Sequence, residues 1–148
     1  MGGGTGDAII GPVAIESYYT DAALTTLHFY DLYVDDSFAD DDLDSNHFRT
    51  IQAAYAAANP GDTIHVAAGT YAQAGTLTLA KRGLTLTGAS RDDVKIDVSA
   101  CGGSWGIHVK ADDVTLEHFT VIPASAAGGG YPIHAAPEPV ASGVSIAN

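Results

Sequence analysis

Residues 47–71 read HFRTIQAAYAAANPGDTIHVAAGTY, and this stretch decides the fold. Ile51, Tyr55 and Ala58 recur at the spacing of one helix face, and the alanines between them have a high helix propensity. The pattern therefore predicts a short amphipathic helix over residues 48–58. A helix of this length is unstable alone, so its apolar face must pack against the layers that follow.

The second half of the stretch predicts a stop, a strand and a corner. Asn59-Pro60-Gly61 ends the helix, because proline cannot continue it and glycine accepts the turn. Alternating apolar residues then predict a strand over 63–67 with Ile64 and Val66 on one face. Gly69-Thr70-Tyr71 predicts the corner that follows.

A sequence repeat follows this unit, with equivalent positions 30 residues apart. Residues 76–88 read TLTLAKRGLTLTG, and residues 106–118 read GIHVKADDVTLEH. Each unit is a strand, a polar turn and a second strand, which cannot be stable without a layer above and below it. The offset aligns the apolar positions Leu77 with Ile107, Leu79 with Val109, Leu84 with Val114 and Leu86 with Leu116, and then reaches Val144 and Ile146.

Composition limits the partners of the chain. Its 148 residues suit one domain, or one domain with an appended segment. The net charge is −12 with only six Lys and Arg, which argues against nucleic acid and against an anionic membrane surface. The chain contains no apolar run of the roughly 20 residues that a membrane span needs. Cys101 is the single cysteine, so no disulfide can form within the chain.

The helix–NPGD–strand–GTY run and the repeat resemble the right-handed parallel β-helix family with pectate-lyase-like repeats, and in particular the first coil of secreted and surface members. The resemblance covers residues 28–122. It implies an all-β fold, a right-handed parallel β-helix (solenoid), in which the helix at 48–58 caps the N-terminal end. It also implies an extracellular or cell-surface location, although Met1-Gly2-Gly3-Gly4 lacks the pattern of a signal peptide.

The resemblance also suggests a division of the chain. Residues 1–27 resemble the tail of a preceding β-helix module, and residues 28–148 resemble the N-terminal cap and first coils of the next. We therefore expect the chain to cross a module junction, as a piece of a longer protein. Residues 28–34, HFYDLYV, read as the first strand of the second module.

An acidic run precedes the helix. Residues 35–46 read DDSFADDDLDSN, and so many carboxylates repel one another, which predicts a solvated loop. Closely spaced Asp oxygens also suit Ca²⁺, although the EF-hand glycine and final glutamate are missing. Calcium is the one cofactor that we consider, with these candidate ligands: Asp35, Asp36, Asp40, Asp42 and Asp44.

Enzymes of the resembled family place carboxylates and a cation on one sheet of the middle coils. Candidates of both kinds are present, but several fall at turn positions, where polar residues are the norm. We therefore assign no catalytic residue and do not expect this chain to be an enzyme by itself. The candidates are Asp92, Asp93, Asp97, Asp112, Asp113, Arg82, Arg91, Lys95 and Lys110.

Two histidines share one pattern. His65 and His108 each sit in an Ile-His-Val triplet, so we expect both rings to face outward while their neighbours face inward. We interpret them as solvent-facing strand residues. The alternative is that they lie on adjacent coils, where they could stack or bind a metal.

Three functions stay open. The first is a non-catalytic structural or interaction module that faces carbohydrate or another surface. The second is a self-assembling unit that joins other copies of itself head to tail, because an uncapped β-helix end presents unpaired backbone groups. The third is a fragment of a polysaccharide lyase or hydrolase. For assembly, the candidate residues are Ile9, Ile10, Val13 and Ile15 at one end and Val144 and Ile146 at the other.

Overall fold

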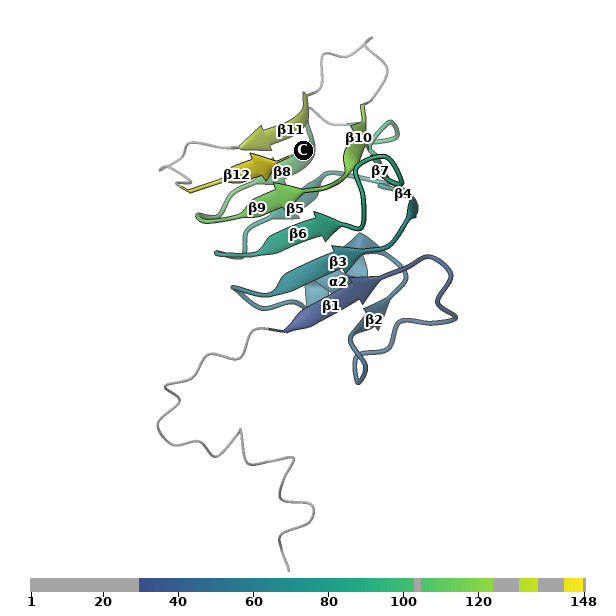
Figure 1. Cartoon of the computed structure of the whole chain (residues 1–148). Helices are drawn as coiled ribbons and strands as arrows, with labels where there is room; N and C mark the ends of the chain where they lie inside the picture. The colour runs from purple at the N-terminus through teal and green to yellow at the C-terminus, as the bar shows by residue number, and fades with distance from the viewer. Residues whose placement is uncertain (1–29, 103–104, 124–130, 136–142, 148) are drawn as a thin grey trace, which may run out of the picture.

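The computed structural model describes residues 30–102, 105–123, 131–135 and 143–147. This part of the chain is mostly β-strand with one short helix, and the strands form parallel sheets with a solenoid-like stacking (Figure 1). The elements in chain order are β1 (Asp31–Val34), β2 (His47–Phe48), α2 (Ile51–Ala57), β3 (Thr63–Val66), β4 (Gly69–Ala72), β5 (Leu77–Leu79), β6 (Thr85–Gly88), β7 (Val94–Asp97), β8 (Trp105–Val109), β9 (Thr115–Glu117), β10 (Thr120–Ile122), β11 (Tyr131–Ala135) and β12 (Ser145–Ala147).

The strands form three sheets that the chain visits in turn. The first sheet has the order β12-β9-β6-β3-β1-β2, the second β10-β7-β4 and the third β11-β8-β5. We call each passage through the three sheets a rung. The first rung is β3, β4 and β5, the second is β6, β7 and β8, the third is β9, β10 and β11, and β12 begins a fourth. Every named strand pair is parallel.

The core consists of apolar columns that run from rung to rung. In the first sheet Leu32, Ile64, Leu86, Leu116 and Ile146 are paired in register, and the first four are at most 2% exposed. A parallel column covers each side chain with the one above and the one below, so alternate residues of a short strand become fully buried. The columns confirm the predicted alignments of the repeat.

The rungs are not of equal length. In the first sheet the register runs from position 64 to 86, then from 86 to 116, and then from 116 to 146, so the first step is shorter than the two equal steps that follow. The predicted offset holds for the steps from 86 to 116 and from 116 to 146 in the first sheet and from 77 to 107 in the third, and no offset was predicted for the step from 64 to 86. The residues that differ in number lie in the corners between strands, because the paired positions stay aligned.

Helix α2 is shorter than the sequence predicted. Thr50 is its N-cap and accepts a hydrogen bond from the backbone N–H of Ala53 at 3.1 Å, so Phe48 falls in β2 instead. Ile51 and Ala54 form the buried face, while Tyr55 is partly buried against the core. No helix of the described chain is long and apolar enough to cross a membrane.

Helix α2 lies beside the ends of β4 and β5. The Gln52 amide donates to the side-chain oxygen of Gln73, which follows β4. The Tyr55 hydroxyl accepts from the backbone N–H of Ala80, which follows β5, at 2.8 Å. The Lys81 ammonium donates to the carbonyls of Tyr55, Ala56 and Ala58, and so satisfies groups that the end of a helix leaves free.

The Asn59–Asp62 turn connects the helix to the first rung. Asp62 is 1% exposed, and its carboxylate accepts from the backbone N–H groups of Asn59 at 2.7 Å and of Tyr30 at 3.0 Å. Gly61 has a φ of 91°, which glycine adopts without strain. One side chain thus holds both the turn and the residue that leads into β1.

The corner at 69–71 is explained by its side chains. The Tyr71 ring folds back over Gly69, where an added Cβ would lie 3.2 Å from the ring. The Tyr71 hydroxyl donates to the carbonyl of Ala67 at 3.0 Å. Burial raises the pKa of this hydroxyl, so it remains a donor.

Candidate functional site: the open end and the polar clusters

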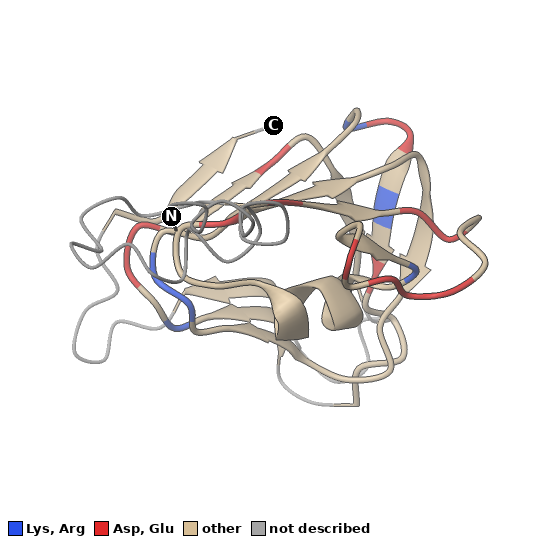
Figure 2. Cartoon of the chain, turned by 90° about the horizontal axis from the view of Figure 1, so that it is seen from below, with Lys and Arg blue, Asp and Glu red and all other residues tan. Residues whose placement is uncertain are grey.

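The acidic loop uses its carboxylates to make turns. Asp42 accepts from the Ser45 hydroxyl at 2.6 Å and from the backbone N–H of Asp44 at 3.0 Å. Asp35 accepts from the backbone N–H of Ser37 at 2.8 Å. In both cases the hydrogen bond from the serine side chain is the main reason that the pKa of the carboxyl is lowered. Acidic residues lie mainly on the loops and corners (Figure 2).

The predicted calcium ligands are therefore spread along this loop rather than gathered. Asp41, which the prediction omitted, accepts from the backbone N–H of Arg49 at 2.7 Å. Asp36 and Asp41 line a cavity of about 440 Å³ together with Arg49 and Tyr71. Within the described ranges, no three His, Cys, Asp or Glu side chains form a group that could hold a metal ion. The calcium site stays a prediction that this arrangement does not support.

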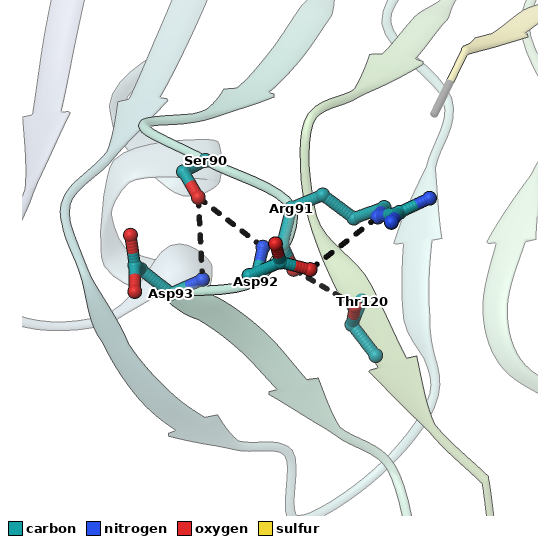
Figure 3. Close-up of polar contacts among 5 residues, drawn as sticks. All are labelled: Ser90, Arg91, Asp92, Asp93 and Thr120. Carbon is teal, nitrogen blue, oxygen red and sulfur yellow. Dashed lines mark hydrogen bonds and ion pairs between the residues drawn. The ribbon is translucent and has the colours of Figure 1, made fainter.

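The candidate catalytic carboxylates lie at separate corners. Asp92 and Asp93 belong to the turn between β6 and β7, where the Ser90 hydroxyl accepts from both of their backbone N–H groups (Figure 3). Arg91 forms an ion pair with Asp92 at 3.5 Å, and Thr120 donates to the Arg91 carbonyl at 2.8 Å (Figure 3). These contacts connect the second rung to the third. They are typical of a corner between strands and do not form a catalytic acid–base pair.

Three more of these candidates, Arg82, Asp113 and Asp97, also have structural contacts. Arg82 pairs with Asp113 at 3.0 Å across the turns that precede β6 and β9. Asp97, on β7, accepts from the backbone N–H of Ser99 at 2.8 Å, and the Ser99 hydroxyl is the main reason that the pKa of this carboxyl is lowered. Gly83 has a φ of 71° and Asp113 a φ of 57°, as expected for the predicted turns.

His65 and His108 lie on neighbouring rungs but in different sheets, so the alternative that they stack or share a metal is wrong. His65 is on β3 of the first sheet and pairs with Tyr33 and Thr87, whereas His108 is on β8 of the third sheet. Their shared Ile-His-Val pattern reflects a common alternation of strand faces, which occurs in every sheet. His65 does face outward, where it stacks on Tyr33 with a centroid separation of 5.2 Å.

His108 differs from the expected solvent-facing residue, because it is only 7% exposed. It packs against Trp105, with ring centroids 4.3 Å apart, and against His134 of β11 at 5.2 Å. His134 was not singled out in the sequence. The pairing of β8 with β11 places positions 108 and 134 in register, but fewer residues separate these strands than separate β5 from β8, so the repeat offset did not predict this pair.

Burial lowers the pKa of His108, and the charges of Lys110 and His134 lower it further. The folded pKa then lies below the unfolded value of about 6.5, so the unfolded chain binds more protons at mildly acidic pH. The contribution of His108 to stability is complete above about pH 6.5 and decreases as the pH falls through the folded pKa.

We therefore expect the urea midpoint in a chelating buffer to decrease between about pH 7.5 and 5.0, and this decrease to be smaller in His108→Gln. His65→Gln is the matched control, since its ring is exposed beside Asp31. Equal pH dependence of the native protein and His108→Gln would contradict the assignment.

The open end is formed by β10, β11 and β12. Each is the outermost strand of its sheet, and no further described strand pairs with it. Ile146 is paired on Leu116, yet it is 56% exposed, whereas Leu116 is 0% exposed. Val144 packs on the core and is partly buried. The predicted assembly residues at this end therefore include one large apolar side chain that nothing in the described chain covers.

A cavity of about 270 Å³ lies at the open end and is lined by residues of β9, β10, β11 and β12. Leu116 and Phe119 form its floor, and Val121, Ile133 and Ile146 stand around it. Val121 and Ile133 are only partly buried, although their neighbours in register, Ile96 and Ile107, are 0% exposed. The other assembly candidates, Ile9, Ile10, Val13 and Ile15, lie outside the described residues, as do residues 1–27 as a whole.

A carbohydrate-facing surface stays a prediction. One side chain that suits it is Tyr33, which is 43% exposed and lines a cavity of about 310 Å³ together with Phe38 and Thr87. Comparisons with protein-family models, with curated proteins and with solved structures each returned no match for this chain. The functional argument therefore rests on the geometry of the chain itself.

Proposed function

We propose that the chain is a non-catalytic structural and interaction module, built as a right-handed parallel β-helix with α2 as its N-terminal cap and located outside the cell or on its surface. It acts through the open end formed by β10, β11 and β12. The observation that carries this proposal is the exposure of Ile146, at 56%, in a column whose other members are at most 2% exposed.

The open end suits a second copy of the chain. Edge strands present unpaired N–H and C=O groups, which pair readily with another strand, and apolar residues beside them gain from burial. The opposite end offers less, because α2 lies beside β4 and β5 through the contacts of Gln52 and Tyr55. Two open ends therefore pair with each other, and the result is a closed dimer with the same surface on both sides.

The test is the mass of the full chain in solution, measured by light scattering after size exclusion across a range of concentrations. We expect a concentration-dependent dimer that Ile146→Asp abolishes, because burying an unpaired carboxylate in the contact is costly. Leu43→Asp is the matched control, since Leu43 is 69% exposed on the acidic loop, away from the open end.

A third variant, Ile10→Asp, distinguishes the two arrangements. A head-to-tail assembly through the segment 8–15 would lose mass with Ile10→Asp as well as with Ile146→Asp, and would form a series of oligomers rather than a dimer. A monomer at all concentrations, or a dimer that survives Ile146→Asp, would overturn the proposal.

A further inference from the structure

The third sheet carries a pair of imidazoles that the open end does not explain. His108 of β8 and His134 of β11 are partners in register on neighbouring parallel strands, and their ring centroids are 5.2 Å apart with an interplanar angle of 62°. Trp105 packs on both, at 4.3 Å from His108 and 4.6 Å from His134. The three rings come from two rungs and form one cluster.

Each imidazole has a buried nitrogen without a partner. Nε2 of His108 and Nδ1 of His134 are both buried, and no hydrogen bond reaches either atom in the described structure. Leaving such an atom unsatisfied costs on the order of 1–3 kcal/mol, so most buried polar atoms have a partner. A ligand bound by both rings would satisfy both atoms at once.

We propose that His108 and His134 bind one divalent transition-metal ion, such as Cu²⁺ or Zn²⁺, through one nitrogen of each ring, with water in the remaining positions. Imidazole nitrogens suit these ions, whereas Ca²⁺ and Mg²⁺ prefer oxygen ligands. The site is thus distinct in chemistry from the acidic loop.

The distance between the two ring centroids permits this site. A metal held about 2.0–2.1 Å from an imidazole nitrogen lies about 3.2 Å from the ring centroid, so two rings at a tetrahedral angle have centroids about 5.2 Å apart. The observed distance between the centroids of His108 and His134 is 5.2 Å.

The surroundings also hold the ring of His134 in place. Trp105 lies over the His134 ring at an interplanar angle of 17°, which fixes the ring while its in-plane nitrogens remain available. The charge of Lys110 acts against a bound cation, while the net charge of −12 attracts cations to the protein as a whole.

The cluster contains its own probe, because Trp105 is the single tryptophan of the chain. We expect CuCl₂ to quench Trp105 fluorescence saturably at one ion per chain, and ZnCl₂ to compete with that quenching. His108→Gln and His134→Gln should each raise the half-saturating concentration by about tenfold or more, the range seen when metal sites lose supporting groups. His65→Gln, the same change in another sheet, should leave it unchanged, and CaCl₂ should neither quench nor compete.

Circular dichroism checks that each variant folds, and His134→Gln decides the matter if the buried His108 does not tolerate replacement. Quenching that never saturates, or that is the same in the native protein and both variants, would overturn the site. This inference does not depend on the proposed dimer, since Ile146→Asp changes the mass in solution and the histidine variants change metal binding.

Discussion

Replacing Gly88 with alanine is expected to destabilise the protein by about 3 kcal/mol or more. Gly88 ends β6, and the third rung passes directly over it. A Cβ at this position would lie 2.1 Å from the carbonyl oxygen of His118 and 3.1 Å from the Cβ of Val94. His118 has a φ of 60°, so the backbone turns here and brings its carbonyl onto Gly88.

The clash is severe because backbone, not a flexible side chain, is in the way. Moving His118 would also disturb its N–H bond to the carbonyl of Ala147 at 3.3 Å. Urea unfolding followed by circular dichroism measures the effect. Gly75→Ala is the control, because a Cβ there would meet nothing within 4 Å, and its midpoint should stay close to that of the native protein. A Gly88→Ala midpoint equal to that of Gly75→Ala would show that the rungs can separate at this point.

Replacing Leu86 with alanine should cost about 2–5 kcal/mol, the usual range for a fully buried leucine. Leu86 is 0% exposed and lies between Ile64 and Leu116, which are also 0% exposed. Strand pairing holds both neighbours at fixed spacing, so the cavity cannot collapse easily.

The same column provides the control for this substitution. Ile146 follows Leu116 in register but is 56% exposed, so Ile146→Ala removes far less buried surface. Under dilute conditions we expect its free energy of unfolding to change by less than about 1 kcal/mol. Equal losses for Leu86→Ala and Ile146→Ala would mean that the column is not the source of stability.

The columns could be predicted from sequence because a parallel rung repeats its inward positions. Leu86 and Leu116 are one repeat apart, and each is followed by a polar residue that faces outward. This alternation can be recognised from the sequence alone. The helix was predicted from the helical spacing of its apolar residues, although its start was not. Thr50 captures a backbone N–H there, a local contact that outweighs the helix propensity of its neighbours.

The side-chain clusters were harder to predict, because they depend on which strands become neighbours. His65 and His108 share a triplet but belong to different sheets, whereas His108 and His134 share no triplet but are paired. Fewer residues separate the paired positions of β8 and β11 than those of β5 and β8, because the segments between the strands differ in length. Asp62 was likewise missed as a contact, since its two backbone donors belong to segments that the sequence does not relate to each other.

The unequal rungs have a consequence for how such a chain can change over evolutionary time. The register of the first sheet is kept although the step from position 64 to 86 is shorter than the step from 86 to 116, so the length of a rung is independent of its inward pattern. Insertions and deletions at corners then leave the core untouched, in line with the tolerance of surface loops to length. Natural variation can therefore lengthen the corners, and alter what they present to a partner, while the stacked columns beneath them stay the same.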